Sequence, residues 1–355
     1  MTGNEPSLRR NPEKARSTIS PEDVDLSRRL RRNRKSQAIR SLVQETRLHP
    51  GNFVAPLFVV EGRGVVDPVA SMPGFSRLSI DLLVKEAEEF LQCAVQAVDL
   101  FCVIPKEKKD SKGSESKREG NLLYRAIESL KDSFPELCVM VDIALDPFTD
   151  HGHDGVLNSE GDVDNDATLV ALAEMCLLSA SAGADVVAPS DMMDGRVGYI
   201  RSRLDREGYD QVSIMAYAAK YASAFYGPFR DALASAPKFG DKKRYQMNPA
   251  NSREALLECA LDEIEGADML LIKPALPYLD IVSKVRERTE LPLGAYHVSG
   301  EYAMVKAAAE RGWIDGERVM YESLLSIRRA GADFIFTYAA KEMSRKILRE
   351  EYYQK

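Results

Sequence analysis

Lys273 is the first residue whose position suggests chemistry. It ends the apolar run "MLLIK" (269–273) and is followed by a proline. Lysine is almost never buried without a partner, and removal from water disfavours its ammonium form and leaves a neutral amine. Such an amine attacks a carbonyl carbon to form a Schiff base. The alternative is a side chain that reaches solvent from the end of the run.

A second lysine, Lys220, lies in the aromatic-rich stretch "MAYAAKYASAFYGPFR" (215–230). Taken alone, it reads as a surface lysine on a packed helix. Two ammonium groups that share one pocket, however, lower each other's affinity for protons. If the fold brings Lys220 and Lys273 together, the pair favours a nucleophilic amine at neutral pH.

The stretch "ALDPFTDHGHDG" (144–155) contains three aspartates spaced four apart, together with His151 and His153. Carboxylates with water suit magnesium, whereas thiolates select zinc. Asp146 and Asp154 therefore either hold a metal or pair with a nearby cation such as Lys242, and we favour the cation pair. We expect the two histidines to order the loop by hydrogen bonds rather than to ligate a metal, and Asp150 adds a charge without an assigned role.

The composition fits a globular protein: the chain has 355 residues, of which 45% are hydrophobic and 29% charged. No run approaches about 18 apolar residues, so we expect no membrane span. The N-terminus lacks the apolar segment of a secretory signal, and its early acids argue against a transit peptide. A cytoplasmic location is expected. The five cysteines stand singly in apolar segments, which is typical of buried reduced thiols.

Charge is unevenly distributed along the chain. Residues 1–40 contain 11 Lys and Arg against 5 Asp and Glu, a net charge of +6. The whole chain carries −7, which leaves −13 for the remainder. A basic segment on an acidic body favours docking on another copy of the same body. The alternative is nucleic-acid binding through residues 28–35, which the acidic remainder would oppose.

Short apolar runs alternate with longer amphipathic segments after residue 35. Uninterrupted runs of this kind suit strands buried on both faces, and a "GAD" sequence precedes three of them, as expected where a glycine ends a helix. The predicted strands are 53–60, 97–104, 137–143, 185–190, 213–217, 268–273, 293–298 and 333–338. Eight strands predict an α/β protein with a (β/α)8 TIM barrel over 36–355 and an extended N-terminal arm over 1–35 that makes oligomer contacts. An open doubly wound sheet is the alternative, but it calls for a G-x-G-x-x-G motif that the chain lacks.

Active sites of such barrels lie where the strands end. Six of the eight predicted strand ends carry a group capable of chemistry: Asp142, Ser190, Lys220 just beyond its strand, Lys273, Ser299 and Tyr338.

The segments "MAYAAKYASAFYGPFRDA", "LLIKPALPYLDIV", "APSDMMDGR", "YHVSGEYAM" and "ALDPFTDHGHDG" resemble the porphobilinogen synthase family, also called 5-aminolevulinate dehydratase. The resemblance runs in order from about residue 30 to 340. It implies a lyase of tetrapyrrole and heme biosynthesis that condenses two 5-aminolevulinate molecules to porphobilinogen with loss of two waters. It also implies an arm-wrapped barrel, usually a homo-octamer, with neither nucleic acid nor membrane as a partner.

The same resemblance assigns roles by position. Lys273 matches the lysine that forms the Schiff base with the propionate-side substrate, and Lys220 the one that engages the acetate-side substrate. The matching substrate-binding residues are Arg230, Lys242 and Gln246 for the acetate-side carboxylate, Ser299 and Tyr338 for the other carboxylate, and Asp142 and Ser190 for the propionate-side amino group. Lys242 departs from the arginine found in many members and loses the planar bidentate fork. The segment 217–242 would form a lid.

Zinc-using members have cysteines at the positions of Ala144, Asp146 and Asp154, so the resemblance implies an aspartate-bearing branch without zinc. Glu258 matches a glutamate that binds an activating, allosteric magnesium away from catalysis; without the resemblance it reads as a solvated helix carboxylate. Two rivals remain: a class I aldolase with one Schiff-base lysine, and a barrel that only binds a small acidic metabolite. Borohydride trapping with substrate separates them.

Overall fold

The computed structural model describes residues 27–349. These residues belong to two units, which are divided after Glu45. In the first unit the described residues form a short 3₁₀ helix, η2 (Leu30–Arg34), and a helix, α1 (Gln37–Leu42), capped by the Ser36 hydroxyl. The segment predicted as an extended arm is therefore helical over Leu30–Arg34, and its predicted end at residue 35 lies inside the first unit. Residues 1–26 of the predicted arm lie outside the described residues.

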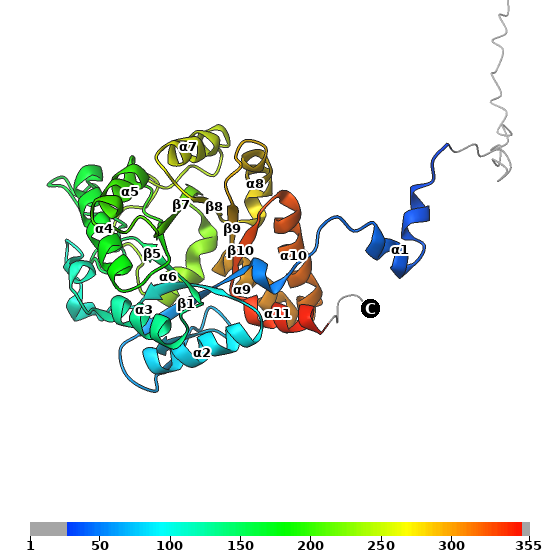
Figure 1. Ribbon diagram of the computed structural model, residues 1–355, viewed down its shortest axis with the longest axis horizontal. Coiled ribbons are helices and arrows are strands. Elements are labelled where there is room, and N and C mark those ends of the chain that lie inside the picture. The colour runs from blue at the N-terminus through cyan, green and yellow to red at the C-terminus, as the bar shows by residue number, and fades with distance from the viewer. Residues whose placement is uncertain (1–26, 350–355) are drawn as a thin grey trace, which may run out of the picture. The chain divides into compact units, whose positions relative to one another are not determined.

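The second unit is a closed barrel of parallel strands (Figure 1). The sheet order runs from β10 back to β4 and β1, and β1 closes the ring on β10 with Phe53 opposite Ile335 and Val54 opposite Phe336. The eight predicted strands are confirmed, with small changes at their ends. They are β1 (Phe53–Val60), β4 (Ala97–Cys102), β5 (Cys138–Ile143), β6 (Val186–Pro189), β7 (Ser213–Lys220), β8 (Met269–Lys273), β9 (Leu293–His297) and β10 (Phe334–Thr337).

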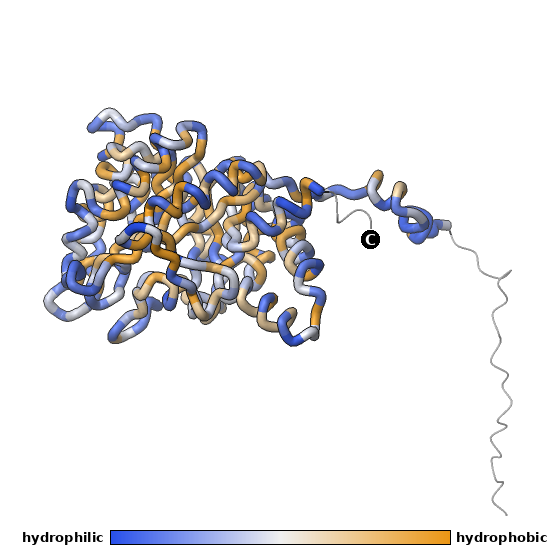
Figure 2. The backbone as a smooth tube through the Cα atoms, turned by 90° about the horizontal axis from the view of Figure 1, so that it is seen from below, coloured by the Kyte–Doolittle hydropathy of each residue, from blue (hydrophilic) through white to orange (hydrophobic). Residues whose placement is uncertain are grey.

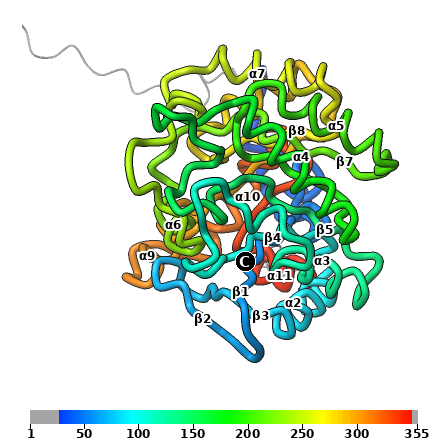
Figure 3. Tube along the Cα trace, turned by 90° about the vertical axis from the view of Figure 1, so that its left-hand side faces the viewer, coloured from blue at the N-terminus to red at the C-terminus, as the bar shows by residue number. Residues whose placement is uncertain are grey.

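Helices follow the strands and surround the barrel (Figures 1 and 3). In α2 the buried residues Leu83, Ala87 and Phe90 recur at helical spacing and form its inward face. The helices are α2 (Ile80–Gln92), α3 (Leu122–Ser133), α4 (Asn165–Ser181), α5 (Arg196–Arg206), α6 (Gly227–Leu233), α7 (Arg253–Ile264), α8 (Leu279–Arg286), α9 (Ser299–Glu310), α10 (Gly316–Ala330) and α11 (Ala340–Leu348). Short 3₁₀ segments are η3 (Pro50–Asn52), η4 (Lys106–Lys108), η5 (Ser114–Lys117), η6 (Ala224–Tyr226) and η7 (Leu276–Tyr278).

A small hairpin between β1 and α2 was not expected from the sequence. It pairs β2 (Val66–Pro68) with β3 (Ser76–Ser79), and β3 continues alongside the end of β1. The strands are too short to show a period. From β3, Arg77 donates hydrogen bonds to the carbonyls of Ala232, at 2.5 Å, and Asp231, at 2.8 Å, so the hairpin holds the end of α6.

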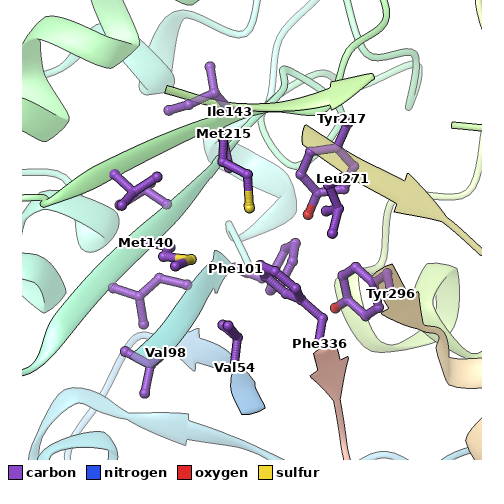
Figure 4. Packing of buried hydrophobic residues seen from close by; sticks show 14 of the residues in the cluster. Val54, Val98, Phe101, Met140, Ile143, Met215, Tyr217, Leu271, Tyr296 and Phe336 are labelled. Atoms are coloured by element: carbon purple, nitrogen blue, oxygen red, sulfur yellow. The ribbon is translucent and has the colours of Figure 1, made fainter. Parts of the chain in front are cut away.

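Large side chains fill the barrel interior, where residues such as Phe101, Tyr296 and Phe336 converge from different strands (Figure 4). Apolar residues concentrate in these central strands, as the hydropathy colouring shows (Figure 2). Gly294 is required here, because a Cβ at that position would lie 2.4 Å from the ring of Phe334. Among residues 27–349, no helix is both long and apolar enough to cross a membrane.

The five cysteines are free thiols, as predicted, and all but Cys138 are fully buried.

Candidate active site

Lys220 and Lys273 lie side by side at the same end of the barrel. Their Cα atoms are register partners on β7 and β8. The prediction ended the strand at Tyr217, but β7 reaches Lys220 after an irregularity between Ala216 and Ala219. A bulge of this kind commonly re-aims a side chain beside an active site. Both lysines are buried, with exposed fractions of 7% and 4%, so neither reaches bulk solvent as the alternative reading required.

The Lys273 ammonium position is surrounded by aromatic rings. Its Nζ lies 4.4 Å from the ring centroid of Tyr296, 4.8 Å from that of Phe229 and 5.2 Å from that of Tyr217. Within the described residues Nζ makes no hydrogen bond or ion pair. Burial, with a smaller contribution from the charge of Lys220, lowers the pKa of Lys273 to about 7. A substantial share of Lys273 is therefore a neutral amine at neutral pH.

Lys220 has polar partners instead. Its Nζ donates to the backbone oxygen of Ser190 and to Asp154 Oδ2, the latter at 3.4 Å. Both partners sit on loops that follow neighbouring strands, so the barrel itself brings them to the lysine.

Asp146 and Asp154 pair with Lys242. Lys242 Nζ contacts Asp154 Oδ1 and lies 3.3 Å from Asp146 Oδ2. Burial alone would lower the pKa of Lys242, but the two carboxylates outweigh it and the pKa is raised. Lys242 and Lys220 likewise hold the pKa of Asp154 below its usual value despite its burial. The cation-pair alternative accounts for this arrangement, and no cluster of three metal-ligating side chains occurs among residues 27–349.

The two histidines of this loop make the ordering contacts that were predicted. His151 Nδ1 accepts from the backbone N–H of His153 at 3.1 Å, and its Nε2 lies 3.2 Å from the carbonyl of Ser111. His153 lies 3.1 Å from the carbonyl of Phe239 and 3.2 Å from the Tyr245 hydroxyl. Both rings thus tie the aspartate loop to neighbouring segments.

The two lysines open into a small cavity with a volume of about 30 Å³. Its lining combines eight of the predicted site residues with two aromatic residues: Asp142, Asp146, Ser190, Lys220, Tyr226, Phe229, Arg230, Lys242, Gln246 and Lys273. Burial raises the pKa of Asp142 to about 6 against the opposing charges of Lys220 and Lys273. The Gln246 carbonyl oxygen Oε1 is buried and has no hydrogen-bond partner in the described chain. The lining therefore brings cations, an amine and an open acceptor together around one small space.

Ser299 and Tyr338 lie behind the cavity wall rather than in it. The Ser299 hydroxyl accepts from the backbone N–H of Phe229 at 2.9 Å. The Tyr338 hydroxyl lies 3.1 Å from that of Tyr296. Both hydroxyls thus contact the residues that surround Lys273.

Sequence reasoning missed Asp99, a lone aspartate inside the apolar run of β4, whose side chain is completely buried. A charged residue at a core position of a strand was the available signal.

Glu258 lines a second, larger cavity with a volume of about 960 Å³. Burial raises its pKa, and the nearby carboxylates of Asp262, Asp194 and Glu254 add to the rise, while Arg196 opposes it. Carboxylate oxygens such as those of Glu258 are suitable ligands for a hydrated magnesium ion, which commonly binds only one or two protein carboxylates. Gln246 lines both cavities.

Comparison with known proteins places these features in a family. A family model described as "Delta-aminolevulinic acid dehydratase" matches residues 27–346. The chain is 53% identical over 317 residues to the delta-aminolevulinic acid dehydratase of Chlamydia pneumoniae, covering 89% of this chain and 95% of that one. It is 52% identical over 347 residues to the chloroplastic enzyme of Glycine max, covering 98% and 84%.

Among solved structures, the delta-aminolevulinic acid dehydratase (porphobilinogen synthase) of Toxoplasma gondii ME49 in complex with porphobilinogen is similar to this fold. The TM-score is 0.90 at 50% identity, covering 92% of this chain and 93% of that chain.

Proposed function

The chain belongs to the delta-aminolevulinic acid dehydratase family and acts as a porphobilinogen synthase, and we propose that it joins its two 5-aminolevulinate molecules through Lys273 and Lys220. The observation that carries this proposal is the pairing of a buried, ring-enclosed lysine with an ion-paired one at adjacent strand ends. A class I aldolase needs only the first of these lysines, and a binding barrel needs neither.

Lys273 is the Schiff-base lysine for the propionate-side substrate. Its lowered pKa supplies the neutral amine that attacks the ketone carbon. The rings of Tyr296, Phe229 and Tyr217 stabilise the iminium cation that follows, because the face of an aromatic ring attracts a cation. The same rings exclude water, which would hydrolyse the iminium.

Lys220 engages the acetate-side substrate. Its contact with Asp154 at 3.4 Å keeps it at the edge of the carboxylate cluster, where it faces the space between Lys242 and Lys273. The acetate-side carboxylate binds among Arg230, Lys242 and Gln246. The open acceptor of Gln246 fits the substrate's amino group or an ordered water.

The propionate-side carboxylate binds at Ser299 and Tyr338, whose hydroxyls exchange their present partners for the substrate. Asp142 and Ser190 receive the propionate-side amino group, and Asp142, with a pKa of about 6, serves as a proton acceptor or donor near neutral pH. Phe229 belongs to the lid segment, and its N–H···Ser299 hydrogen bond couples lid closure to this carboxylate site.

Magnesium is the proposed metal, bound at Glu258 in the larger cavity and outside the catalytic cavity. Burial raises the pKa of Glu258, and the acidic groups around it add to the rise; a divalent cation would relieve this repulsion. The bound ion stabilises the active form allosterically by mass action. Zinc is not proposed, because Ala144 has no donor and Asp146 and Asp154 are engaged by Lys242.

The assembly is a homo-octamer in this proposal, and the basic N-terminal segment supplies contacts between copies. Deletion of residues 1–35 is expected to leave a folded barrel that forms smaller particles, measured by light scattering. An unchanged particle mass would contradict this role. We also propose a cytoplasmic location, which imaging of a tagged full-length chain tests.

A coloured-product assay with 5-aminolevulinate, combined with borohydride trapping, tests the proposed roles. Porphobilinogen should form, and reduction with substrate present should attach label to Lys273. Label on another lysine, with Lys273 unmodified, would contradict the assignment. Label without any porphobilinogen would instead support the aldolase alternative.

A further inference from the structure

Asp99 lies inside the barrel. It stands two residues before Phe101 on β4, and side chains two apart on a strand point to the same face. Phe101 points into the interior, toward the rings of Tyr296 and Phe336 (Figure 4). Asp99 has an exposed fraction of 0% and does not line the catalytic cavity. Its carboxyl group is therefore buried beneath the active site.

The Asp99 carboxyl group has no structural partner. Neither Oδ1 nor Oδ2 makes a hydrogen bond in the described part of the chain, and the Tyr217 hydroxyl beside it is also unpartnered. A buried, uncompensated charge destabilises a fold strongly. Burial, together with the charge of Asp142, accordingly raises the pKa of Asp99 well above its usual value. Asp99 contributes no contact that explains its presence.

The ionisable groups that interact electrostatically with Asp99 come from several strands of the barrel. They are Cys138 and Asp142 on β5, Tyr217 on β7, Lys273 on β8, Tyr296 on β9 and Tyr338 after β10. Lys273 is the cation of this set. The other two cavity lysines, Lys220 and Lys242, are already compensated by Asp146 and Asp154. The carboxyl groups of Asp99 and Asp142 both interact with Lys273, and Asp142 interacts with Lys220 as well.

We propose that Asp99 is a positioning residue for protons: through Tyr217 and Asp142 it keeps a proton on the carboxyl pair while Lys273 is a neutral amine, so that this proton is available when the Schiff base forms. The inference rests on the proposed role of Lys273. Asp99 acts through Asp142, which lines the cavity, and does not touch the substrate.

The proton balance of this step closes within the barrel. The Lys273 amine forms a bond to the ketone carbon, and the carbon–oxygen bond breaks. The oxygen leaves as water, with one proton from the amine and one from the carboxyl pair. The products are a protonated iminium, water and a carboxyl pair that has lost its shared proton, so the net charge of the buried region is the same before and after the step. The carboxylate then serves as the counter-ion of the iminium.

The test compares Asp99→Asn and Asp99→Leu with the wild type in pH profiles of kcat and KM. Without Asp99, only Asp142 can hold the proton. The pKa of Asp142 is about 6, so Asp142 has already lost its proton at about pH 7, where Lys273 becomes a neutral amine. We expect the alkaline limb of the kcat profile to move to lower pH and kcat near pH 8 to fall about 100-fold. KM should stay within about twofold, because no substrate contact is lost.

Urea unfolding separates this role from a structural one. Asp99→Leu removes an unpartnered buried carboxyl, so its unfolding midpoint should equal or exceed that of the wild type while kcat falls. Ser344→Ala, which removes another buried unpartnered group away from the cavity, is the matched control and should leave kcat and its pH profile unchanged.

Two results would overturn the inference. One is a folded Asp99 variant whose kcat, and the alkaline limb of whose kcat–pH profile, are the same as in the wild type. The other is loss of activity that only accompanies loss of cooperative unfolding. Activity retained in Lys273→Ala would instead refute the proposed function itself, so the two failures are distinguishable.

Discussion

Lys220 and Lys273 occupy equivalent places at the ends of adjacent strands, yet their surroundings are opposite. Lys220 lies against a carboxylate and a backbone carbonyl, whereas Lys273 lies among aromatic rings without a polar partner in the described chain. Identical side chains on one register therefore differ in chemistry because of what the loops bring to them. In the proposed mechanism the lysine without partners is the nucleophile, and the ion-paired one orients the second substrate.

The largest expected effect comes from removing one lysine at a time. Lys273→Ala should abolish porphobilinogen formation and borohydride labelling, because it removes the amine proposed to form the Schiff base. Lys220→Ala should also stop turnover but should retain labelling of Lys273 by the first substrate. Turnover and peptide mass spectrometry measure both. Substantial activity in Lys273→Ala would contradict the comparison.

Asp154→Asn removes the feature that distinguishes Lys220. It leaves the ammonium groups of Lys220 and Lys242 without their shared carboxylate. Loss of one partner from a buried ion pair should lower the free energy of unfolding by about 3 kcal/mol, with a large fall in kcat at every magnesium concentration.

Urea unfolding measures the stability change in Asp154→Asn. The control is Asp280→Asn, which breaks an exposed pair with Lys284 and should change neither stability nor kcat measurably. Equal stability of the two variants would show that the buried cluster is unimportant for the fold.

The pH dependence of amine labelling sharpens the comparison without a mutation. Because the pKa of Lys273 is lowered to about 7, its reactive amine is scarce at pH 5 and predominates at pH 9. Competitive acylation of the substrate-free protein, followed by peptide mass spectrometry, should give half-maximal reactivity of Lys273 near pH 7. A midpoint near the ordinary lysine value of about 10.4 would mean that Lys273 is not desolvated in solution.

The smallest effect is expected away from both lysines. Magnesium should raise the activity of the wild type severalfold. Glu258→Ala should lose this increase, and its activity in the presence of a chelator should equal that of the wild type under the same conditions. The control Glu310→Ala, an exposed glutamate on α9, should keep the stimulation. If Glu258→Ala keeps it and Asp154→Ala loses it, magnesium binds at the aspartates instead.

The sequence predicted the barrel because each strand is a short run buried on both faces, a pattern that needs no knowledge of partners. It also indicated Lys273, Asp142 and Ser190, which directly end or follow such runs. It could not predict that β7 continues to Lys220, because a bulge depends on the neighbouring strand. The hairpin β2–β3 could not be predicted for the same reason: its strands are defined by their pairing with each other and not by a periodic pattern of apolar residues.

The surroundings of each site residue were less predictable than its identity. The rings around Lys273 come from β7, η6, α6 and β9, and only the folded barrel brings these segments together. The choice between a metal and a cation pair at Asp146 and Asp154 likewise depended on where Lys242, some 90 residues away, would lie. Asp99 was overlooked because its role depends on residues from other strands.

The placement of the thiols has a consequence for chemical resistance. Burial raises the pKa of Cys102, Cys176 and Cys259, and that of Cys138 to about 11. Oxidants and soft heavy metals attack thiolates rather than thiols, and the described lining of the catalytic cavity contains no cysteine. Catalysis at this site should therefore tolerate peroxide and thiophilic metal ions that inactivate enzymes dependent on exposed thiolates.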